Sequence, residues 1–115
     1  MQYALLIHEK PGVYEALSDE ERKAITDEYW ALREHPDIVG GASLQPTSAA
    51  TTVREDDGKL LVTDGPFADT KEVFAGFYLL EAANLDAALA IAQKVPAVRL
   101  GGSVEVRPLR EGRRN

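Results

Sequence analysis

Apolar residues first gather in a short run near the start of the chain. From Tyr3 to His8 the sequence is almost continuously apolar, and Lys10-Pro11-Gly12 closes the run with turn-forming residues. A short run of this kind is typical of a strand that is buried on both faces. We therefore expect this strand to lie in the centre of its sheet.

The next periodic segment predicts a helix from Asp19 to Glu34. Ser18 and Glu21 have the spacing of a capping box, and Pro36 ends the segment. Apolar residues recur at helical spacing along it. The predicted buried stripe is Ile25, Tyr29 and Leu32.

A second helix is predicted between Asn84, which has the character of a cap residue, and Pro96. The apolar residues between them again recur at helical spacing. We expect the buried stripe to be Leu85, Ala88, Leu89, Ala92 and Val95.

The middle and the end of the chain have the pattern of strands. An extended stretch runs from Gly40 to Val53, and the Asp57-Gly58 pair predicts a tight hairpin turn before a returning strand, Lys59 to Thr63. Alternating residues predict two more strands, Val73 to Glu81 and Ser103 to Arg107.

The predicted order of elements is β-α-β-β-β-α-β, which is the split βαβ or ferredoxin-like plan of the α+β class, with its middle connection drawn out as a hairpin. Both helices are expected on one face of an antiparallel sheet. The other face also has apolar residues, which would leave an apolar patch in water if nothing covered them. A second copy of the chain is the simplest cover, so we expect a homodimer.

Composition narrows the class of protein. The chain has 115 residues, a formal net charge of -6 and no cysteine. It fits a single domain, and its charge argues against nucleic acid as a partner. The start has no basic segment typical of a signal peptide, and no apolar run reaches the roughly 18 residues of a membrane span. We expect a soluble, cytoplasmic protein with a flexible basic tail at residues 110–115.

The least interchangeable stretch is the loop Thr63-Asp64-Gly65-Pro66-Phe67-Ala68-Asp69-Thr70-Lys71-Glu72. Gly65 can adopt a positive φ, Pro66 fixes its own φ, and the Asp64 carboxylate can accept hydrogen bonds from nearby amides. The loop closely resembles the signature of the DGPF family, a branch of the YCII-related domain proteins. Three further segments support the resemblance: Leu44-Gln45-Pro46, Ala50-Thr51-Thr52-Val53-Arg54 and Val104-Glu105-Val106-Arg107-Pro108-Leu109.

The resemblance covers about Tyr3 to Leu109 and implies one domain over residues 1–109. It also implies a dimeric α+β barrel, in which two sheets close face to face around a cavity. Members of the wider family are suspected of using a histidine in the first helix together with an aspartate. Here the segment Asp19 to Glu34 has no histidine, so that role cannot be transferred to this chain.

Asp64 and His8 are the candidate catalytic residues. The Asp64 carboxylate either presents a base at the barrel mouth or only organises its own loop. Histidine exchanges protons near neutral pH, and His8 shares its side of the strand with Ala4 and Leu6, so it is either a polar strand end or an acid–base group in the cavity. His35 follows the first helix, where a positive charge interacts favourably with the helix dipole, and we expect it to have this role.

The candidate ligand-binding residues are Glu105, Arg107, Phe67 and Tyr78. Glu105 and Arg107 alternate with two valines, so both should face away from the helices. Arg107 can bind a ligand carboxylate, or it can pair with Glu105. For the aromatic residues Phe67 and Tyr78, ordinary packing is the alternative.

Neither a cofactor nor a metal is expected. The sequence has no Gly-rich phosphate loop that opens a helix and no recognisable metal-ligand spacing. Our first hypothesis is therefore a protein that binds a small organic molecule and, if an enzyme, acts as a cofactor-independent lyase or isomerase by proton transfer. The alternative is a non-enzymatic interaction or regulatory module, because DGPF-like domains also occur alongside sigma-factor proteins of transcription.

Overall fold

The structure is a computed structural model that describes residues 1–66 and 71–110. The predicted site residue Phe67 and most of the predicted basic tail lie outside the described residues. In chain order the elements are β1 (Gln2–Glu9), α1 (Asp19–Arg33), β2 (Ile38–Ser43), η1 (Thr47–Ala49), β3 (Thr51–Asp56), β4 (Lys59–Asp64), β5 (Val73–Glu81), α2 (Leu85–Ala92), η2 (Pro96–Leu100) and β6 (Ser103–Pro108).

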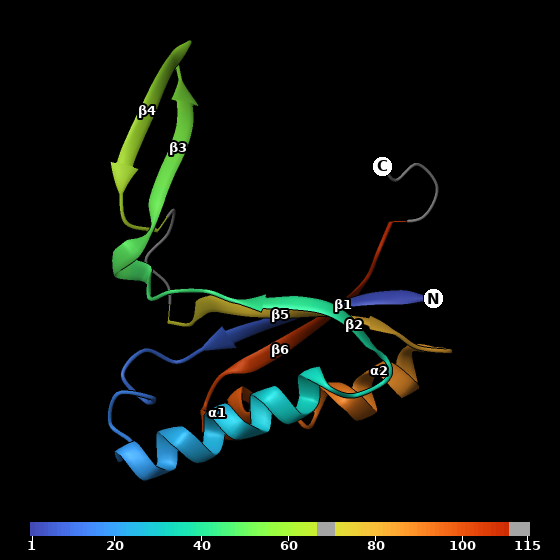
Figure 1. Cartoon of the computed structure of the whole chain (residues 1–115). Coiled ribbons are helices and arrows are strands. Elements are labelled where there is room, and N and C mark those ends of the chain that lie inside the picture. Colours follow the sequence, from blue (N-terminus) through green and yellow to red (C-terminus); the bar gives the residue numbers. More distant parts are fainter. Residues whose placement is uncertain (67–70, 111–115) are drawn as a thin grey trace.

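Four strands form one antiparallel sheet in the order β2-β5-β1-β6, with β1 inside the sheet as predicted. Both α-helices lie on the same side of this sheet (Figure 1). The arrangement is the expected α+β, ferredoxin-like plan. We call the side of the sheet away from the helices the open face.

The core lies between the sheet and the helices. Tyr3, Leu5 and Ile7 of β1 are buried there with Leu80 of β5. The other side of β1 is only partly buried in a single chain. The predicted burial of β1 on both faces is therefore wrong for the chain alone, because no element of the described chain packs over the open face.

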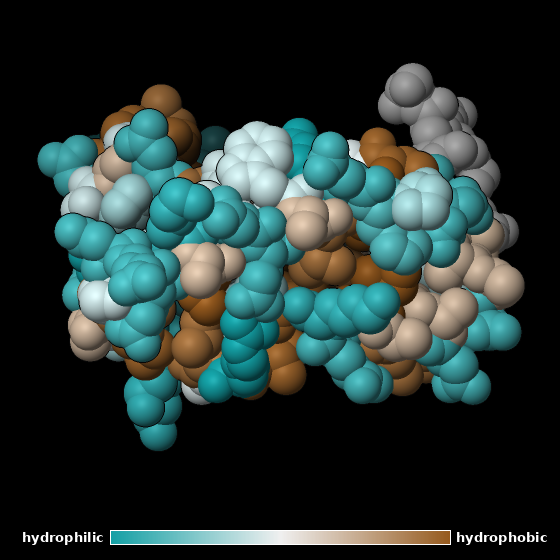
Figure 2. All heavy atoms as spheres, turned by 60° about the horizontal axis from the view of Figure 1, so that its bottom comes forward, coloured by the Kyte–Doolittle hydropathy of each residue, from teal (hydrophilic) through white to brown (hydrophobic). Residues whose placement is uncertain are grey.

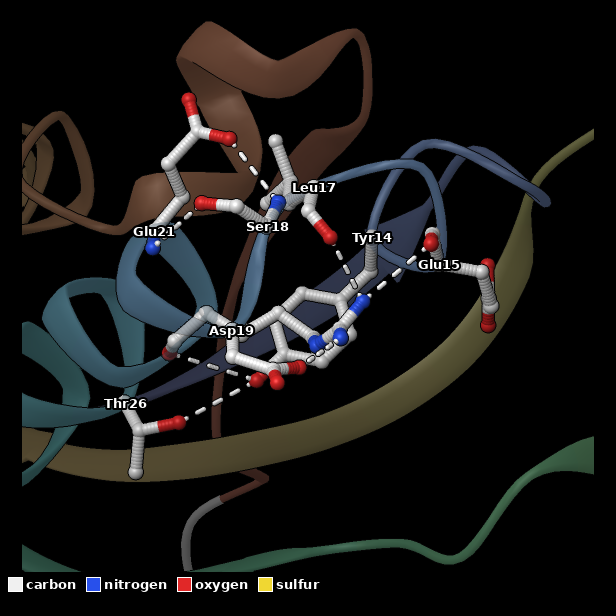
Figure 3. A network of polar contacts seen from close by, with 8 residues as sticks. Tyr14, Glu15, Leu17, Ser18, Asp19, Glu21 and Thr26 are labelled. Carbon is white, nitrogen blue, oxygen red and sulfur yellow. Dashed lines mark hydrogen bonds and ion pairs between the residues drawn. The ribbon is translucent and has the colours of Figure 1, made fainter.

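Helix α1 begins at the predicted capping box. The Ser18 hydroxyl accepts from the Glu21 amide, and the Glu21 carboxylate accepts from the Ser18 amide. Figure 3 shows these contacts together with the Tyr14 hydroxyl, which lies 3.1 Å from the Thr26 hydroxyl. The Arg22 guanidinium donates to the Leu17 carbonyl at 2.7 Å. These contacts fix the turn that connects β1 to α1.

Helix α2 is capped by the Asn84 side chain, as predicted, and it buries part of the predicted stripe, Ala88 and Ala92, with Val95 buried just after the helix. The buried residues are Ala88, Ile91 and Ala92, whereas the side chains of Leu85 and Leu89 are 49% and 38% exposed. Small alanines allow the helix to approach the sheet closely, so they face the core. Figure 2 looks onto this outer helix side, where apolar side chains show between polar ones.

The predicted extended stretch Gly40 to Val53 is two strands rather than one. Strand β2 belongs to the main sheet, and the η1 turn then leads into β3, which pairs only with β4. The predicted turn has positive φ at both Asp57 (54°) and Gly58 (79°), as a type I′ hairpin requires. The hairpin β3–β4, which we call the arm, rises from the sheet on the side away from the helices (Figure 1).

One irregularity in β5 changes which residues share a face. Ile7 is opposite Gly76, but the next residue, His8, is opposite Phe74, so the register shifts by one residue at Ala75. Such a bulge reverses the alternation on one side of it. Phe74 therefore lies with His8 rather than with Tyr78, contrary to simple alternation along the strand.

Candidate functional site

The open face is built from rows of side chains that cross the sheet. In one row Leu6 is opposite both Phe77 of β5 and Glu105 of β6. In the next row Ala4 lies between Leu79 and Arg107. Partners in an antiparallel pair point to the same side, so these charged side chains stand beside apolar ones on an uncovered surface.

His8 lies on this face together with Ala4 and Leu6, the residues with which alternation grouped it; the sequence had left open which face these residues share. Its side chain is 29% exposed, and its ring centroid lies 5.6 Å from that of Phe74 in a tilted arrangement. The His8 Nε2 atom lies 3.9 Å from Oε1 of Glu105. That distance allows electrostatic attraction but is too long for a hydrogen bond.

Glu105 connects His8 to Arg107. Its second carboxylate oxygen, Oε2, lies 3.6 Å from Nε of Arg107. The predicted pairing of the two β6 side chains is thus observed, on the predicted face. Within residues 1–66 and 71–110, none of the three side chains makes a hydrogen bond, so their polar atoms remain accessible to a ligand.

A groove of about 780 Å³ adjoins this cluster at the end of the sheet from which the arm rises. His8 and Phe74 form its wall on the sheet. The other lining residues come from the segments on either side of the arm: Leu44, Gln45, Pro46, Thr47, Ala49, Ala50, Pro66, Lys71, Glu72 and Val73. The volume lies in the range of small-molecule sites.

Asp64 does not join this cluster. It ends β4 opposite Thr51, is exposed, and does not line the groove. Its carboxylate accepts no hydrogen bond from the described residues, so neither of its two predicted roles is seen within a single chain. Gly65 organises the turn instead: its φ is 101°, its amide donates to the Ala50 carbonyl and its carbonyl accepts from Thr52, each at 2.7 Å.

Tyr78 was predicted to bind ligand, and the structure contradicts this. Its side chain is buried on the helix side, where its hydroxyl donates to the Tyr29 carbonyl at 2.8 Å. The reason is that Tyr78 is opposite Leu5, which is buried on the helix side, in the regular part of the pairing. His35 has a local role: its Nδ1 accepts from the Asp37 amide at 3.0 Å.

Phe74 and Glu72 are site residues that the sequence did not reveal. The Glu72 carboxylate accepts from the Ser103 hydroxyl at 2.6 Å, which joins the segment before β5 to the start of β6. The sequence signal that could have revealed the position of Phe74 is Gly76, because an isolated glycine in a strand often marks a bulge.

Three groups on the helix side of the sheet have raised pKa values. Burial raises the pKa of Tyr78 and of Tyr29, and burial followed by repulsion from Glu15 raises the pKa of Glu9. Glu9 and Tyr29 line a cavity of about 20 Å³. This cavity holds about one water molecule, so it cannot accommodate an organic ligand.

Two further observations concern metal ligands and membrane-spanning helices. In the described ranges, no three His, Asp or Glu side chains converge as metal ligands would. None of the described helices combines the length and the apolar character needed to cross a membrane.

Comparison with known proteins places the chain in a family. The chain is 40% identical over 114 residues to an uncharacterised protein of Rhizobium meliloti (strain 1021), which covers 95% of this chain and 92% of the relative. A solved structure with a similar fold is 5-chloro-2-hydroxyhydroquinone dehydrochlorinase from Burkholderia phenoliruptrix AC1100, in complex with 2,5-dihydroxybenzoquinone. The TM-score is 0.55 at 16% identity, over 97% of this chain and 96% of that chain.

The family model described as YCII-related domain matches residues 1–113. The match includes every element of the fold and both charged residues of β6. The chain therefore belongs to the YCII-related domain family.

Proposed function

We propose that the protein is a homodimer in which two open faces enclose a cavity that binds a small organic molecule and exchanges protons with it. The observation that carries the proposal is the cluster of His8, Glu105 and Arg107 on an otherwise apolar, uncovered sheet face. A face that served only to hold two copies together would not need three charged or titratable groups in neighbouring rows of the sheet.

The arrangement suggests a division of roles. The Arg107 guanidinium can bind an anionic oxygen of a ligand, since it has several donors in a planar fork. Because Glu105 lies within 4 Å of both its neighbours, it holds the Arg107 guanidinium and the His8 ring in position by electrostatic attraction. His8 is the group that would take a proton from the ligand or return it.

Apolar surroundings define the class of ligand. Leu6, Phe77 and Phe74 offer flat apolar contacts beside the charged groups. A planar hydroxylated ring with an ionised oxygen matches both features. The dehydrochlorinase of similar fold was solved with 2,5-dihydroxybenzoquinone, and this compound is a suitable probe, although the likeness itself is one of fold.

The first test measures binding. Titration of 2,5-dihydroxybenzoquinone into the protein, followed by calorimetry, should show saturable binding that Arg107→Gln weakens at least tenfold. Arg99→Gln is the matched control, because Arg99 pairs with Glu28 on the helix side. Equal affinities of the two variants would contradict the proposed site.

The second test measures proton transfer. Exchange of the ring hydrogens of the same probe for deuterium can be followed by NMR, with and without protein. General-base catalysis typically contributes on the order of a hundredfold or more, so His8→Gln should remove most of any acceleration while binding persists. A protein that binds the probe without accelerating exchange is a binding protein only. No binding of any such ring compound favours the interaction-module hypothesis.

A further inference from the structure

The arm is the part of the molecule that its own chain leaves uncovered. Strands β3 and β4 pair only with each other, as a separate two-stranded sheet. The radius of gyration is 16.0 Å, whereas a compact chain of this length has about 13 Å. The arm is thus a projection from the compact body, as Figure 1 shows.

One face of the arm carries three exposed apolar residues, with Glu55 opposite Leu60 on the same side. Val53 and Val62 are directly opposite each other, and Leu60 follows on the same side. Their exposed fractions are 61%, 59% and 69%. An isolated two-stranded hairpin is marginally stable in water at best, and exposed apolar side chains that adjoin one another indicate a contact surface. The arm therefore needs a cover.

The sheet has two ends of different character. The arm leaves it beside Ser43 and Val73, at the end where His8 is opposite Ser103. The far end carries the exposed apolar residues Met1 and Val39. Figure 1 shows the arm and the end of β6 at opposite ends of the sheet.

The length of the arm favours contact with a second copy of the chain rather than with the sheet from which the arm extends. Each arm strand has six residues, which corresponds to roughly 20 Å. Stacked sheets lie about 10 Å apart. An arm that rises from one open face therefore extends beyond the plane of a sheet packed on that face.

Two identical sheets can stack about a two-fold axis that is either perpendicular or parallel to the strands, and the distribution of charge favours one of them. The arm ends in the carboxylates of Glu55, Asp56 and Asp57 with a single ammonium, Lys59, opposite Asp56, so its tip is negative on balance. The far end of the sheet has the guanidinium groups of Arg107 and Arg110, while its Glu81 carboxylate is already paired with the N-terminal ammonium. A two-fold axis that runs between the sheets and perpendicular to the strands brings the arm of one copy to the far end of the other. An axis parallel to the strands would bring the two acidic arm ends together, which like charges oppose.

We propose that each arm embraces the far end of the partner's sheet, with its exposed apolar residues against Met1 and Val39 and its acidic tip beside Arg110 of the partner subunit. This inference rests on the proposed homodimer and specifies its geometry. The contact is isologous, so it occurs twice in each dimer. It also means that each cavity is closed at one end by the partner's arm.

Cysteine cross-linking tests the geometry directly, because the chain has no cysteine of its own. Two single variants, Asp56→Cys and Arg110→Cys, are mixed, allowed to exchange subunits and oxidised with glutathione disulfide. We expect the mixture to form a disulfide-linked pair at least tenfold faster than either variant alone. Asp56→Cys mixed with Glu20→Cys is the control, since Glu20 lies in the first turn of α1 on the helix side.

The possible outcomes separate this inference from the proposed function. Sedimentation that shows a dimer, without the Asp56–Arg110 link, overturns the arm contact and leaves the enclosed cavity standing. Fast linking of Asp56→Cys with itself also overturns it and indicates the other two-fold axis. A mass that matches the single chain of 12.6 kDa at micromolar concentration overturns both proposals.

Discussion

Asp64 stands at the end of β4 with an exposed carboxylate, opposite Thr51. Since no described residue donates a hydrogen bond to it, Asp64→Asn should change the free energy of unfolding by no more than about 0.5 kcal/mol. Thermal unfolding of the variant measures this. Gly65→Ala is the informative contrast, because the φ of 101° at Gly65 disfavours any side chain. A large loss of stability in Asp64→Asn would restore the structural role.

Glu9 provides a pH-dependent prediction. Burial, and then repulsion from Glu15, raises the pKa of Glu9 above its usual value of 4.5. A raised pKa in the folded state means that this carboxyl stabilises the fold fully below about pH 4.5 and loses that contribution as the pH rises through the folded-state pKa. Glu9→Gln should therefore melt at a higher temperature than the wild type at pH 7.

The gain in Glu9→Gln should vanish as the pH falls to about 4, where the wild-type carboxyl is itself protonated. Melting temperatures measured between pH 4 and pH 7.5 test both parts. Glu20→Gln, in the exposed first turn of α1, serves as the control and should show no such trend, because Glu20 lies outside the contact proposed for the arm. A gain that is constant across the pH range would show that the amide acts through packing.

At this scale the sequence predicted the open-face cluster well. Alternation alone placed His8 with Leu6, and Glu105 with Arg107, because side-chain direction in a regular strand follows from position. Phe74 was not predicted as a site residue, because a bulge depends on how two strands meet and not on either strand alone. Whether Asp64 approaches a partner's site depends on a second chain, which no single-chain pattern can specify.

Among the elements, strands β2 and β5 approach each other closely at a glycine. A Cβ atom added to Gly76 would lie 2.6 Å from the Ala42 carbonyl oxygen, which is backbone and cannot move independently. Gly76→Ala should therefore cost about 2 kcal/mol. Gly40→Ala in β2 is the matched control, because its Cβ would meet only the Leu79 side chain at 3.5 Å.

Urea denaturation distinguishes the two glycine variants. We expect a clearly lower midpoint for Gly76→Ala and a midpoint close to that of the wild type for Gly40→Ala. Equal midpoints would mean that β2 can shift to accommodate the methyl group. In that case the edge strand would be less tightly held than its pairing with β5 indicates.

Most elements were predictable because their ends carry local signals. Ser18 and Asn84 cap helices through contacts within three residues, and the turn at Asp57 needs only its own backbone. The buried side of α2 was predicted in part: Ala88 and Ala92 are buried, but Leu85 and Leu89 are exposed. Leu85 and Leu89 lie on one side of α2, and Ala88 and Ile91 lie on another. The side that contains Ala88 packs against the sheet, because its small side chains permit close packing.

For the whole molecule, the central question is what covers the open face. Phe77 lies on that face and is only partly buried in a single chain. Phe77→Asp should leave the helix-side core intact but convert the proposed dimer to monomers, since a buried unpaired carboxylate opposes association. Sedimentation velocity measures the mass, and circular dichroism confirms the fold.

Leu89→Asp is the control for this prediction. Leu89 is 38% exposed on the outer side of α2, so a carboxylate there should leave the mass of the assembly unchanged. If Phe77→Asp remains a dimer, the two copies associate through another surface and the open face serves a different partner.

The cytoplasmic location expected from the sequence stays a prediction.

The shift in register between β1 and β5 has a consequence for which positions of β5 tolerate substitution. After Gly76, every second residue of β5 is constrained by the helix-side core, but Phe74, before it, belongs to the wall of the groove. The bulge thus uncouples two halves of one strand. Sequence change before Gly76 can alter the shape of the groove while the spacing of the core stays intact. In this chain, a substitution before Gly76 is therefore expected to leave the helix-side core undisturbed.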